Sequence, residues 1–468
     1  MADLLLQLEP QETVTRQPGD RRVIADYLRC PDDSLRLASV DNVSAQPGFF
    51  HFGSDLVCYG RCSGFVPPKV YRGASQLLQD VLEYTRTEDG VLTVPFTLSE
   101  IVDGLRREKY AGALGPDLRR CCDNSAIRAG YYAVRPFLTV SVRKHIQRLW
   151  LRGWERKLFP AWPVDTTVER LLDAVVGMAL DAAGQQEIPM VWFWPEGKRA
   201  CCLMTHDVES AAGRDFCDRL MDVDDAYEIK SSFQVIPERR YRVSTQFLHS
   251  FWSRGFELNV HDLNHDGKLF EDFGEFERRC RIINEYATAF GARGFRAAVL
   301  YRNTDWLEAL AFQYDMSIPN VAHLDPQPGG CCTVFPFFMG DLLEIPTTMT
   351  QDYSLFHLLR QYSIDLWKEQ AAIVLEKHGV MNFITHPDYL AGKKEMRVYK
   401  ELLGYLNELR DTEDLWIPLP CELNEWWRQR SRMRLVKNGR SWKIEGDPSG
   451  RARLAFATRE NGKVVYKF

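Results

Sequence analysis

The chain has 468 residues, of which 45% are hydrophobic and 26% are charged, and its formal net charge is −5. This length predicts two or three domains with the composition of a soluble globular protein, and the small negative charge excludes a generally basic nucleic-acid binder. The first residues lack the pattern of a secretory signal, and no apolar stretch approaches the ~20 residues that span a bilayer, so we expect a cytoplasmic protein.

The first region, residues 1–190, mixes strand-like and helical stretches, and we expect an α+β region of unassigned fold. Residues 91–95 (VLTVP) predict a strand, and residues 76–86 (QLLQDVLEYTR), which contain neither glycine nor proline, predict a helix. A second helix is predicted over residues 167–183, because apolar residues recur there at helical spacing: Leu171, Leu172, Val175, Val176 and Met178.

The region 191–430 alternates short apolar runs with amphipathic helices such as 276–291 and 366–379. This alternation predicts a parallel sheet, and the number of units favours a distorted (β/α)7-8 barrel over an open doubly wound sheet. The expected strands are 200–205, 231–237, 256–260, 294–299, 316–319, 342–346, 381–385 and 415–420. Residues 431–468 alternate between turn sequences, which predicts a small antiparallel β add-on.

Side chains that bind metals or move protons lie in or after five of the eight predicted strands. Because the carboxyl ends of parallel barrel strands meet at one face, we expect these side chains to form one site. In chain order they are Asp207, Glu209, His261, His265, Arg296, Asp352 and His386.

The residue types are suited to metal-assisted hydrolysis. A divalent metal takes two imidazoles and one carboxylate and keeps a position open for water and a substrate oxygen. His261 and His265 supply the nitrogens, and either Asp207 or Glu209 supplies the oxygen. The remaining carboxylate can act as a base, and His386 can protonate a leaving group.

Each residue also has an ordinary structural interpretation. Two histidines four residues apart are commonly solvated, and Asp207 could cap a loop. Arg296 could form a structural ion pair rather than hold the base ionised. His386, before a proline, could be a turn residue, and Glu209 could simply face water, as an acid after a strand often does.

The order and spacing of these residues resemble the polysaccharide deacetylase family, carbohydrate esterase family 4. The family motif Thr-Phe-Asp-Asp corresponds to residues 205–209 (THDVE), and His-(Ser/Thr)-x-x-His corresponds to residues 261–265 (HDLNH). The motif Arg-x-Pro corresponds to residues 296–298 (RAA), and Leu-x-His corresponds to residues 384–386 (ITH). The resemblance covers roughly residues 198–425, about half of the chain.

The resemblance implies a distorted β/α barrel that removes acetyl groups from N-acetylated sugars with a divalent metal, usually zinc. It implies Asp207 as the base, His386 as the general acid, and His261 and His265 as metal ligands. The family's second aspartate, also a ligand, is replaced by a valine here, so we assign Glu209 to that role. If Glu209 points away, Asp207 must bind the metal and the base is missing.

Two further motifs depart from the family. The proline after Arg296 is absent. The fourth motif, Asp-x-x-Asp-Trp, is irregular, because Asp305-Trp306 follows Arg296 too soon and looks like a capped helix start. Asp352 is the better candidate by position.

Residues 140–160 combine tryptophans and an apolar face with many arginines and lysines. This pattern predicts either a peripheral contact with an anionic membrane or with a phosphate-bearing lipid-linked sugar, or a helix packed on the barrel with a solvated basic face.

We therefore expect a cytoplasmic, metal-dependent deacetylase acting on a carbohydrate, such as a nucleotide- or lipid-linked precursor. One alternative is an amide hydrolase that acts on a non-sugar C–N bond with the same scaffold. Another is an inactive glycan-binding or scaffolding module, which predicts weak or absent metal binding.

Overall fold

The computed structural model describes residues 14–15, 18–40, 42–73, 76–115, 145–149 and 151–468. Its largest sheet is curled, with strands in the order β13-β14-β12-β11-β10-β9-β8-β15 and with β16 paired to β8. The mixed α/β class predicted from the alternation is confirmed. The strands are β8 (Ala200–Val208), β9 (Ser232–Val235), β10 (Glu257–His261), β11 (Gly294–Arg296), β12 (Tyr314–Asp315), β13 (Phe337–Met339), β14 (Leu342–Glu344), β15 (Val380–Thr385) and β16 (Leu415–Trp416).

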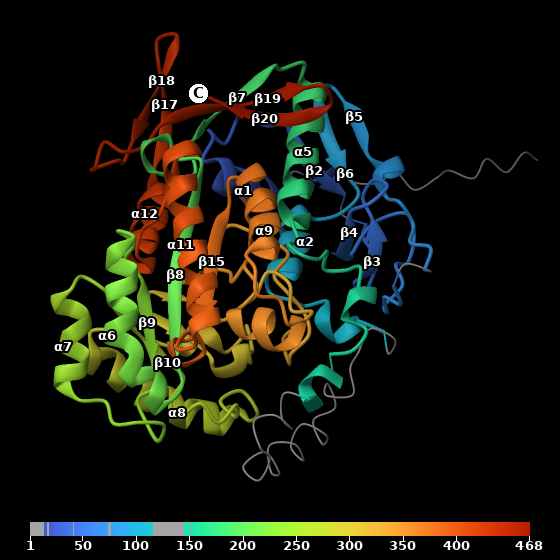
Figure 1. Ribbon diagram of the computed structural model, residues 1–468. Helices are drawn as coiled ribbons and strands as arrows, with labels where there is room; N and C mark the ends of the chain where they lie inside the picture. The colour runs from blue at the N-terminus through green and yellow to red at the C-terminus, as the bar shows by residue number, and fades with distance from the viewer. Residues whose placement is uncertain (1–13, 16–17, 41, 74–75, 116–144, 150) are drawn as a thin grey trace, which may run out of the picture.

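Strand β8 forms the middle of this part of the sheet. It pairs in parallel with β9, β15 and β16, and all of its residues are buried. A continuous apolar run is typical of a parallel strand covered on both faces. Figure 1 shows helices α6, α7 and α11 along one side of the strands. The helices of this region are α6 (Ala211–Ala226), α7 (Thr245–Ser253), α8 (Phe273–Phe290), α9 (Asp365–Glu376), α10 (Pro387–Leu390), α11 (Lys393–Thr412) and α12 (Pro420–Arg432).

Between β14 and β15 the curled sheet is connected by irregular backbone and not by strand pairing. Within the described residues no ladder joins these two strands. The irregular segment 345–350 lies there instead: Thr348 Oγ1 donates a hydrogen bond to Val380 O at 2.6 Å and accepts one from Asn382 N at 2.9 Å. Met349 N donates to Asn382 O at 3.3 Å. Irregular backbone therefore links the two sides of the sheet.

Two sequence-based predictions of elements differ from the structure. The helix predicted over 76–86 is wrong: this stretch contains a short 3-10 helix, η1 (Leu82–Tyr84), and the first residue of β5 (Arg86–Glu88). Asp80 Oδ1 accepts hydrogen bonds from Gly53 N and Leu82 N, both at 2.9 Å, and such side-chain bonds compete with a helix. The strand predicted at 316–319 is found two residues earlier, as β12 (Tyr314–Asp315). It ends there because Ser317 N and Oγ bond to the Asp315 carboxylate and do not continue the strand pairing.

The N-terminal region forms a smaller sheet in the order β1-β2-β6-β5, with β1 (Val14–Thr15), β2 (Leu37–Val40) and β6 (Val91–Val94), beside a hairpin of β3 (Gly48–His51) and β4 (Val57–Gly60). The predicted strand at 91–95 is confirmed as β6. Helices α1 (Pro18–Leu28), α2 (Leu98–Arg106) and α5 (Thr167–Ala183) accompany the sheet, and α5 has the bounds that its apolar spacing predicts.

The C-terminal tail forms two antiparallel hairpins, β17 (Arg434–Asn438) with β18 (Ser441–Glu445), and β19 (Leu454–Glu460) with β20 (Lys463–Lys467). The expected strands are therefore present. Strand β19 also pairs with β7 (Glu187–Val191), a strand that the periodicity did not reveal. Figure 1 shows β7, β19 and β20 side by side, so the tail packs onto the end of the first region.

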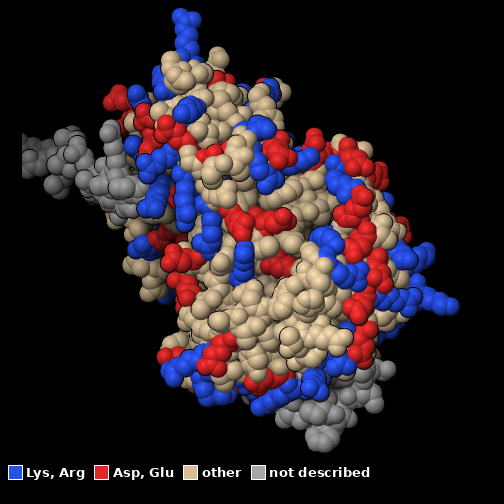
Figure 2. Space-filling model, turned by 90° about the vertical axis from the view of Figure 1, so that its left-hand side faces the viewer, with Lys and Arg blue, Asp and Glu red and all other residues tan. Residues whose placement is uncertain are grey.

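Charged side chains of both signs are intermingled on the face that carries α6 and α7 (Figure 2), in agreement with the small net charge. Among the described residues, no helix has the length and apolar character that crossing a membrane requires. Of the basic stretch 140–160, residues 140–144 and 150 lie outside the described residues. Its remainder is not one continuous helix, because Gly153 has a φ of 85° and a 3-10 helix, η5 (Trp154–Arg156), follows.

Glu169 of α5 provides a test of how this helix packs. Its side chain is fully buried, with Oε1 accepting hydrogen bonds from the Thr333 hydroxyl and from Val334 N. Burial raises the pKa of Glu169 from 4.5 to about 7, against the lowering effects of Thr333 and Arg106. The stabilisation that the protonated Glu169 side chain gives to the folded protein is therefore fully present below pH 4.5. It is lost as the pH rises through about 7.

We accordingly expect the variant Glu169→Gln, which mimics the protonated side chain, to match the wild type near pH 4.5. At about pH 8 the wild type should have a free energy of unfolding up to ~3 kcal/mol below that of the variant. Denaturant unfolding of both proteins across this range measures the difference. A difference that does not change with pH would contradict the assignment.

Candidate functional site

The seven predicted site residues come together at the carboxyl ends of β8, β10, β11 and β15. Asp207 lies on β8, His261 on β10 and Arg296 on β11. His386 directly follows β15, and Asp352 follows the irregular segment after β14. Glu209 and His265 lie in the loops after β8 and β10. Parallel strands bring these positions to one edge of the sheet, as the barrel argument requires.

The alternation of side chains along β8 separates two polar networks. Asp207 faces the site, whereas His206 points to the opposite face, where its Nε2 lies 3.0 Å from Asp224 Oδ2. Asp224 also accepts hydrogen bonds from Ser231 Oγ and Tyr399 Oη, both at 2.6 Å. The histidine of the THDVE motif is thus part of a buried network that anchors α6 to the strand.

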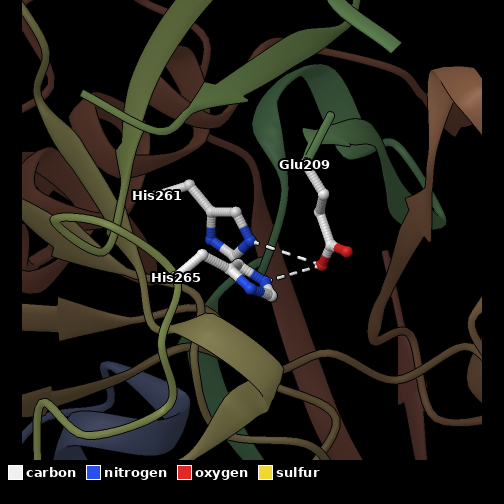
Figure 3. A group of neighbouring side chains, drawn as sticks. All are labelled: Glu209, His261 and His265. Carbon is white, nitrogen blue, oxygen red and sulfur yellow. Dashed lines mark ion pairs between the residues drawn. The ribbon is translucent and has the colours of Figure 1, made fainter. Parts of the chain in front are cut away.

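Glu209, His261 and His265 form the one group of potential metal ligands found among the described residues (Figure 3). Their ligand atoms all lie within 4.8 Å of one another. Glu209 Oε1 is 2.7 Å from His265 Nε2 and 3.8 Å from His261 Nε2. Both imidazoles are buried, and both Nε2 atoms face the Glu209 carboxylate. Two buried nitrogens directed at one carboxylate are the donor set that a zinc-like cation takes.

The contacts of each Nδ1 atom determine whether the Nε2 atom of the same ring can bind a metal. His261 Nδ1 donates to Arg296 O at 3.0 Å, which leaves the lone pair on Nε2 free for a metal. His265 differs, since Arg240 Nη2 lies 3.0 Å from its Nδ1 and can only donate. The same Arg240 nitrogen donates to His265 O at 2.7 Å. Binding a metal through His265 Nε2 therefore requires Arg240 to keep only its bond to the carbonyl oxygen.

The loop that follows His261 and carries His265 is held by its acidic residues. Asp262 and His265 both have a left-handed backbone, with φ values of 55° and 56°. Asp262 N donates to Arg296 O at 2.9 Å, and its own Oδ1 accepts from Leu263 N. Asp266 accepts two hydrogen bonds from Arg279 of α8, at 2.7 and 2.9 Å. These contacts keep His265 turned back toward His261.

Asp207 is held by Arg296 deep in the site. Arg296 Nη1 donates to Asp207 Oδ1 at 2.7 Å and to Thr205 Oγ1 at 2.8 Å, and both charged side chains are buried. Burial would raise the pKa of Asp207, but Arg296, His261 and His386 together outweigh burial and lower it. The second oxygen, Oδ2, lies 3.8 Å from His261 Nε2. Asp207 is therefore an ionised carboxylate with one oxygen directed toward the ligand group.

His386 and Asp352 form a second pair across the site. Asp352 Oδ1 accepts from His386 Nδ1 at 2.7 Å, and Oδ2 accepts from His386 N at 2.8 Å. Burial would lower the pKa of His386, but Asp352 and then Glu209 raise it well above its ordinary value. His386 Nε2 lies 3.6 Å from Glu209 Oε1. This imidazole is therefore oriented as a proton donor toward the metal-ligand group.

Asp305, which completes the irregular Asp-Trp sequence, lies on the surface near Arg107, outside the site. Arg240 belongs to the site but was missed, although it follows β9 and therefore lies at the same end of the sheet as the other site residues.

No protein-family model matches the chain, and no curated protein matches it. A solved structure described as a polysaccharide deacetylase from Mycobacterium smegmatis is similar, with 16% sequence identity and a TM-score of 0.43 over 54% of this chain and 98% of that one. The chain resembles polysaccharide deacetylases in its fold.

Two other structures similar to this chain differ from that deacetylase in what they do. Puue allantoinase has 11% identity and a TM-score of 0.41, over 50% of this chain and 92% of that one. A carbohydrate esterase family 4 pseudoenzyme from Bacillus anthracis has 14% identity and a TM-score of 0.32, over 49% and 66% of the two chains. Because identities and TM-scores are low, the function has to be inferred from the geometry of the site.

Proposed function

We propose that this protein is a metal-dependent hydrolase that removes an acetyl group from an N-acetylated sugar. The observation that carries the proposal is the arrangement around Glu209: the Nε2 atoms of His261 and His265 both face its carboxylate. The ionised carboxylate of Asp207 lies 3.8 Å from His261 Nε2, and the proton donor His386 lies 3.6 Å from Glu209 Oε1. These are the groups that amide hydrolysis needs: a ligand set, a base and an acid.

Glu209, His261 and His265 would hold a divalent cation, for which two imidazoles and one carboxylate favour zinc. When bound, such an ion would polarise the acyl oxygen and make a bound water more acidic. Oδ2 of Asp207 is available to take a proton from the attacking water, because Oδ1 is engaged by Arg296. Arg296 thereby keeps the base ionised without blocking it.

His386 Nε2 is the proton donor to the leaving amine, and Asp352 holds the ring in the required orientation through Nδ1. In the complete reaction a C–O bond forms to water and the C–N bond breaks. Asp207 takes up one proton and His386 delivers one. The products are acetate and the free amino sugar.

We also propose that residues 191–430 form the catalytic β/α barrel, with residues 1–190 and 431–468 as accessory regions. In support, the candidate base, acid and ligands all fall between residues 207 and 386. The parallel pairing of β8 to β12 with β14 and β15 also supports a barrel-like arrangement.

Release of acetate from a panel of substrates tests the proposal. The panel contains N-acetylglucosamine oligomers, a nucleotide-linked N-acetyl sugar and N-acetylated amino acids. We expect acetate only from the sugars, loss of the activity on chelation, and recovery with zinc. Acetate from the amino acids alone would favour the non-sugar amide hydrolase, and no turnover with any divalent metal would favour an inactive binding module.

A further inference from the structure

A second feature lies beside the site, a cavity of about 650 Å³ that the proposed reaction does not use. We call it the arginine pocket. Its wall consists of described residues from 148–156, together with Leu324 and the end of a π-helical turn, η9 (Ser354–Leu359). The lining residues are Arg148, Leu151, Arg152, Gly153, Trp154, Glu155, Arg156, Leu324, Leu358 and Leu359.

The charges around this pocket are unbalanced. Arg148, Arg152 and Arg156 line it, and within the described part of the chain none of the three has an ion-pair partner. Among the described lining residues Glu155 is the one acid, so these residues together present a net of two positive charges to the cavity. The Nε atom of Arg148 is buried without a hydrogen-bond partner. Unpaired guanidinium groups that face a cavity favour a dianionic ligand, and their planar forks match phosphate oxygens.

The pocket lies next to the acid of the proposed reaction. Tyr353 directly follows Asp352, and its hydroxyl bonds to Gln147, the residue before Arg148. The ring of Tyr353 is 5.6 Å from that of Tyr389, which in turn is 4.8 Å from the ring of His386. The turn η9 continues from Tyr353 to Leu358 and Leu359 in the wall of the pocket. A short chain of contacts therefore joins the pocket to His386.

The arginine pocket lies on the side of the site from which the rest of the substrate is expected to extend. The acid protonates the leaving nitrogen, and this nitrogen remains on the sugar, so the rest of the substrate extends from the side of His386. A smaller neighbouring cavity shares Leu324 and is lined by Trp162, Gln351 and Ser354. The rings of Trp154 and Trp162 lie 4.6 Å apart, one in each cavity. Aromatic rings with nearby polar groups suit a sugar ring that leads into a charged pocket.

We propose that the arginine pocket binds the diphosphate of a sugar diphosphate, so that the substrate is an activated N-acetyl sugar rather than a neutral glycan. This inference rests on the proposed deacetylase function for the role of the sugar, whereas binding of a diphosphate by the pocket can be tested without turnover. Both a nucleotide and an isoprenoid lipid carry sugars through a diphosphate. The leucines in the wall and the open cavity leave room for either attachment.

Calorimetric titration of the full chain with inorganic pyrophosphate tests this assignment. The test variant is Arg152→Glu/Arg156→Glu, which changes two exposed side chains. The control is Lys437→Glu/Arg440→Glu, which makes the same charge change on the exposed hairpin β17–β18. We expect the wild type and the control to bind alike, and the test variant to bind at least about tenfold more weakly.

Each other result would overturn the assignment. No binding by the wild type, or equal weakening in both variants, would leave no specific diphosphate site. Loss of binding in His261→Ala but not in the test variant would place the anion at the metal-ligand group. If the double variant fails to fold, Arg152→Gln and Arg156→Gln, tested singly, must each weaken binding.

Two further ligands distinguish a nucleotide-linked from a lipid-linked sugar. Comparing pyrophosphate binding with acetate release tests the anion site and the deacetylase activity separately. Tighter binding of uridine diphosphate than of pyrophosphate would indicate a nucleotide, and tighter binding of geranyl pyrophosphate a lipid. Pyrophosphate binding without acetate release from any sugar would contradict the deacetylase and keep the anion site. Acetate release from neutral sugars without pyrophosphate binding would contradict the pocket alone.

Discussion

Replacing Glu108 with alanine is expected to lower the free energy of unfolding by about 3–5 kcal/mol. Glu108 accepts hydrogen bonds from two guanidinium nitrogens of Arg302, with the Nε contact at 2.6 Å, and from Gly330 N at 2.5 Å. Both charged side chains are buried. Alanine would leave the Arg302 charge inside the protein without its partner, and this costs far more than losing an exposed ion pair.

The ion pair between Arg107 and Glu308 provides the control, because it joins the same two regions of the chain. Its nitrogen–oxygen distance is 2.8 Å, but the Glu308 side chain is 40% exposed. We expect Glu308→Ala to cost less than about 1 kcal/mol. Glu108 has a φ of 55°, and alanine faces the same backbone demand as glutamate there, so the difference reports the buried pair. Equal losses in denaturant unfolding of the two variants would contradict this reasoning.

Replacing His386 with alanine is expected to slow acetate release by about 10²–10⁴-fold, the range that general acid–base groups contribute. The variant should keep its metal, because His386 is outside the group formed by Glu209, His261 and His265. Asp352 would lose its bond to His386 Nδ1, but it keeps the bond from Tyr353 N at 2.6 Å. Steady-state rates and metal analysis on the same preparation separate loss of the acid from loss of the ion.

His378 offers a matched control at the other end of β15. It precedes the strand, whereas His386 follows it, and its Nδ1 lies 3.1 Å from Arg199 O, away from the site. We expect His378→Ala to keep the wild-type rate within a factor of a few. If His386→Ala also kept that rate, the leaving amine would have to receive its proton from another group, and the proposed mechanism would be wrong.

Features that depend on local sequence patterns could be predicted, whereas features that depend on contacts between distant segments could not. Helix α5 and strand β8 could be predicted because their apolar spacing is a local property, and the site residues because parallel strands end at one edge. The pairing of β7 with β19 could not be predicted, because the two strands are distant in the chain and register depends on tertiary contacts. The helix expected at 76–86 is absent because Asp80 bonds to two backbone N–H groups, which composition does not show.

In the candidate site, too, local motifs could be predicted and long-range contacts could not. Sequence spacing identified His261 and His265 as a pair, and a motif comparison pointed to Glu209 in place of the missing aspartate. Only the structure reveals that Arg240 contacts His265 Nδ1 and that Asp352 orients His386. These contacts join segments that are far apart in the chain, so no local pattern contains them.

The central claim is that Glu209, His261 and His265 hold a divalent metal ion, and metal content by mass spectrometry tests it most directly. Wild type, His378→Ala, His261→Ala and Glu209→Ala are purified without added metal and then incubated with zinc, cobalt or manganese. We predict about one ion per chain in the first two proteins and none in the last two. Metal that persists in Glu209→Ala would move Asp207 into the ligand set, and a wild type that takes up no ion would contradict the claim.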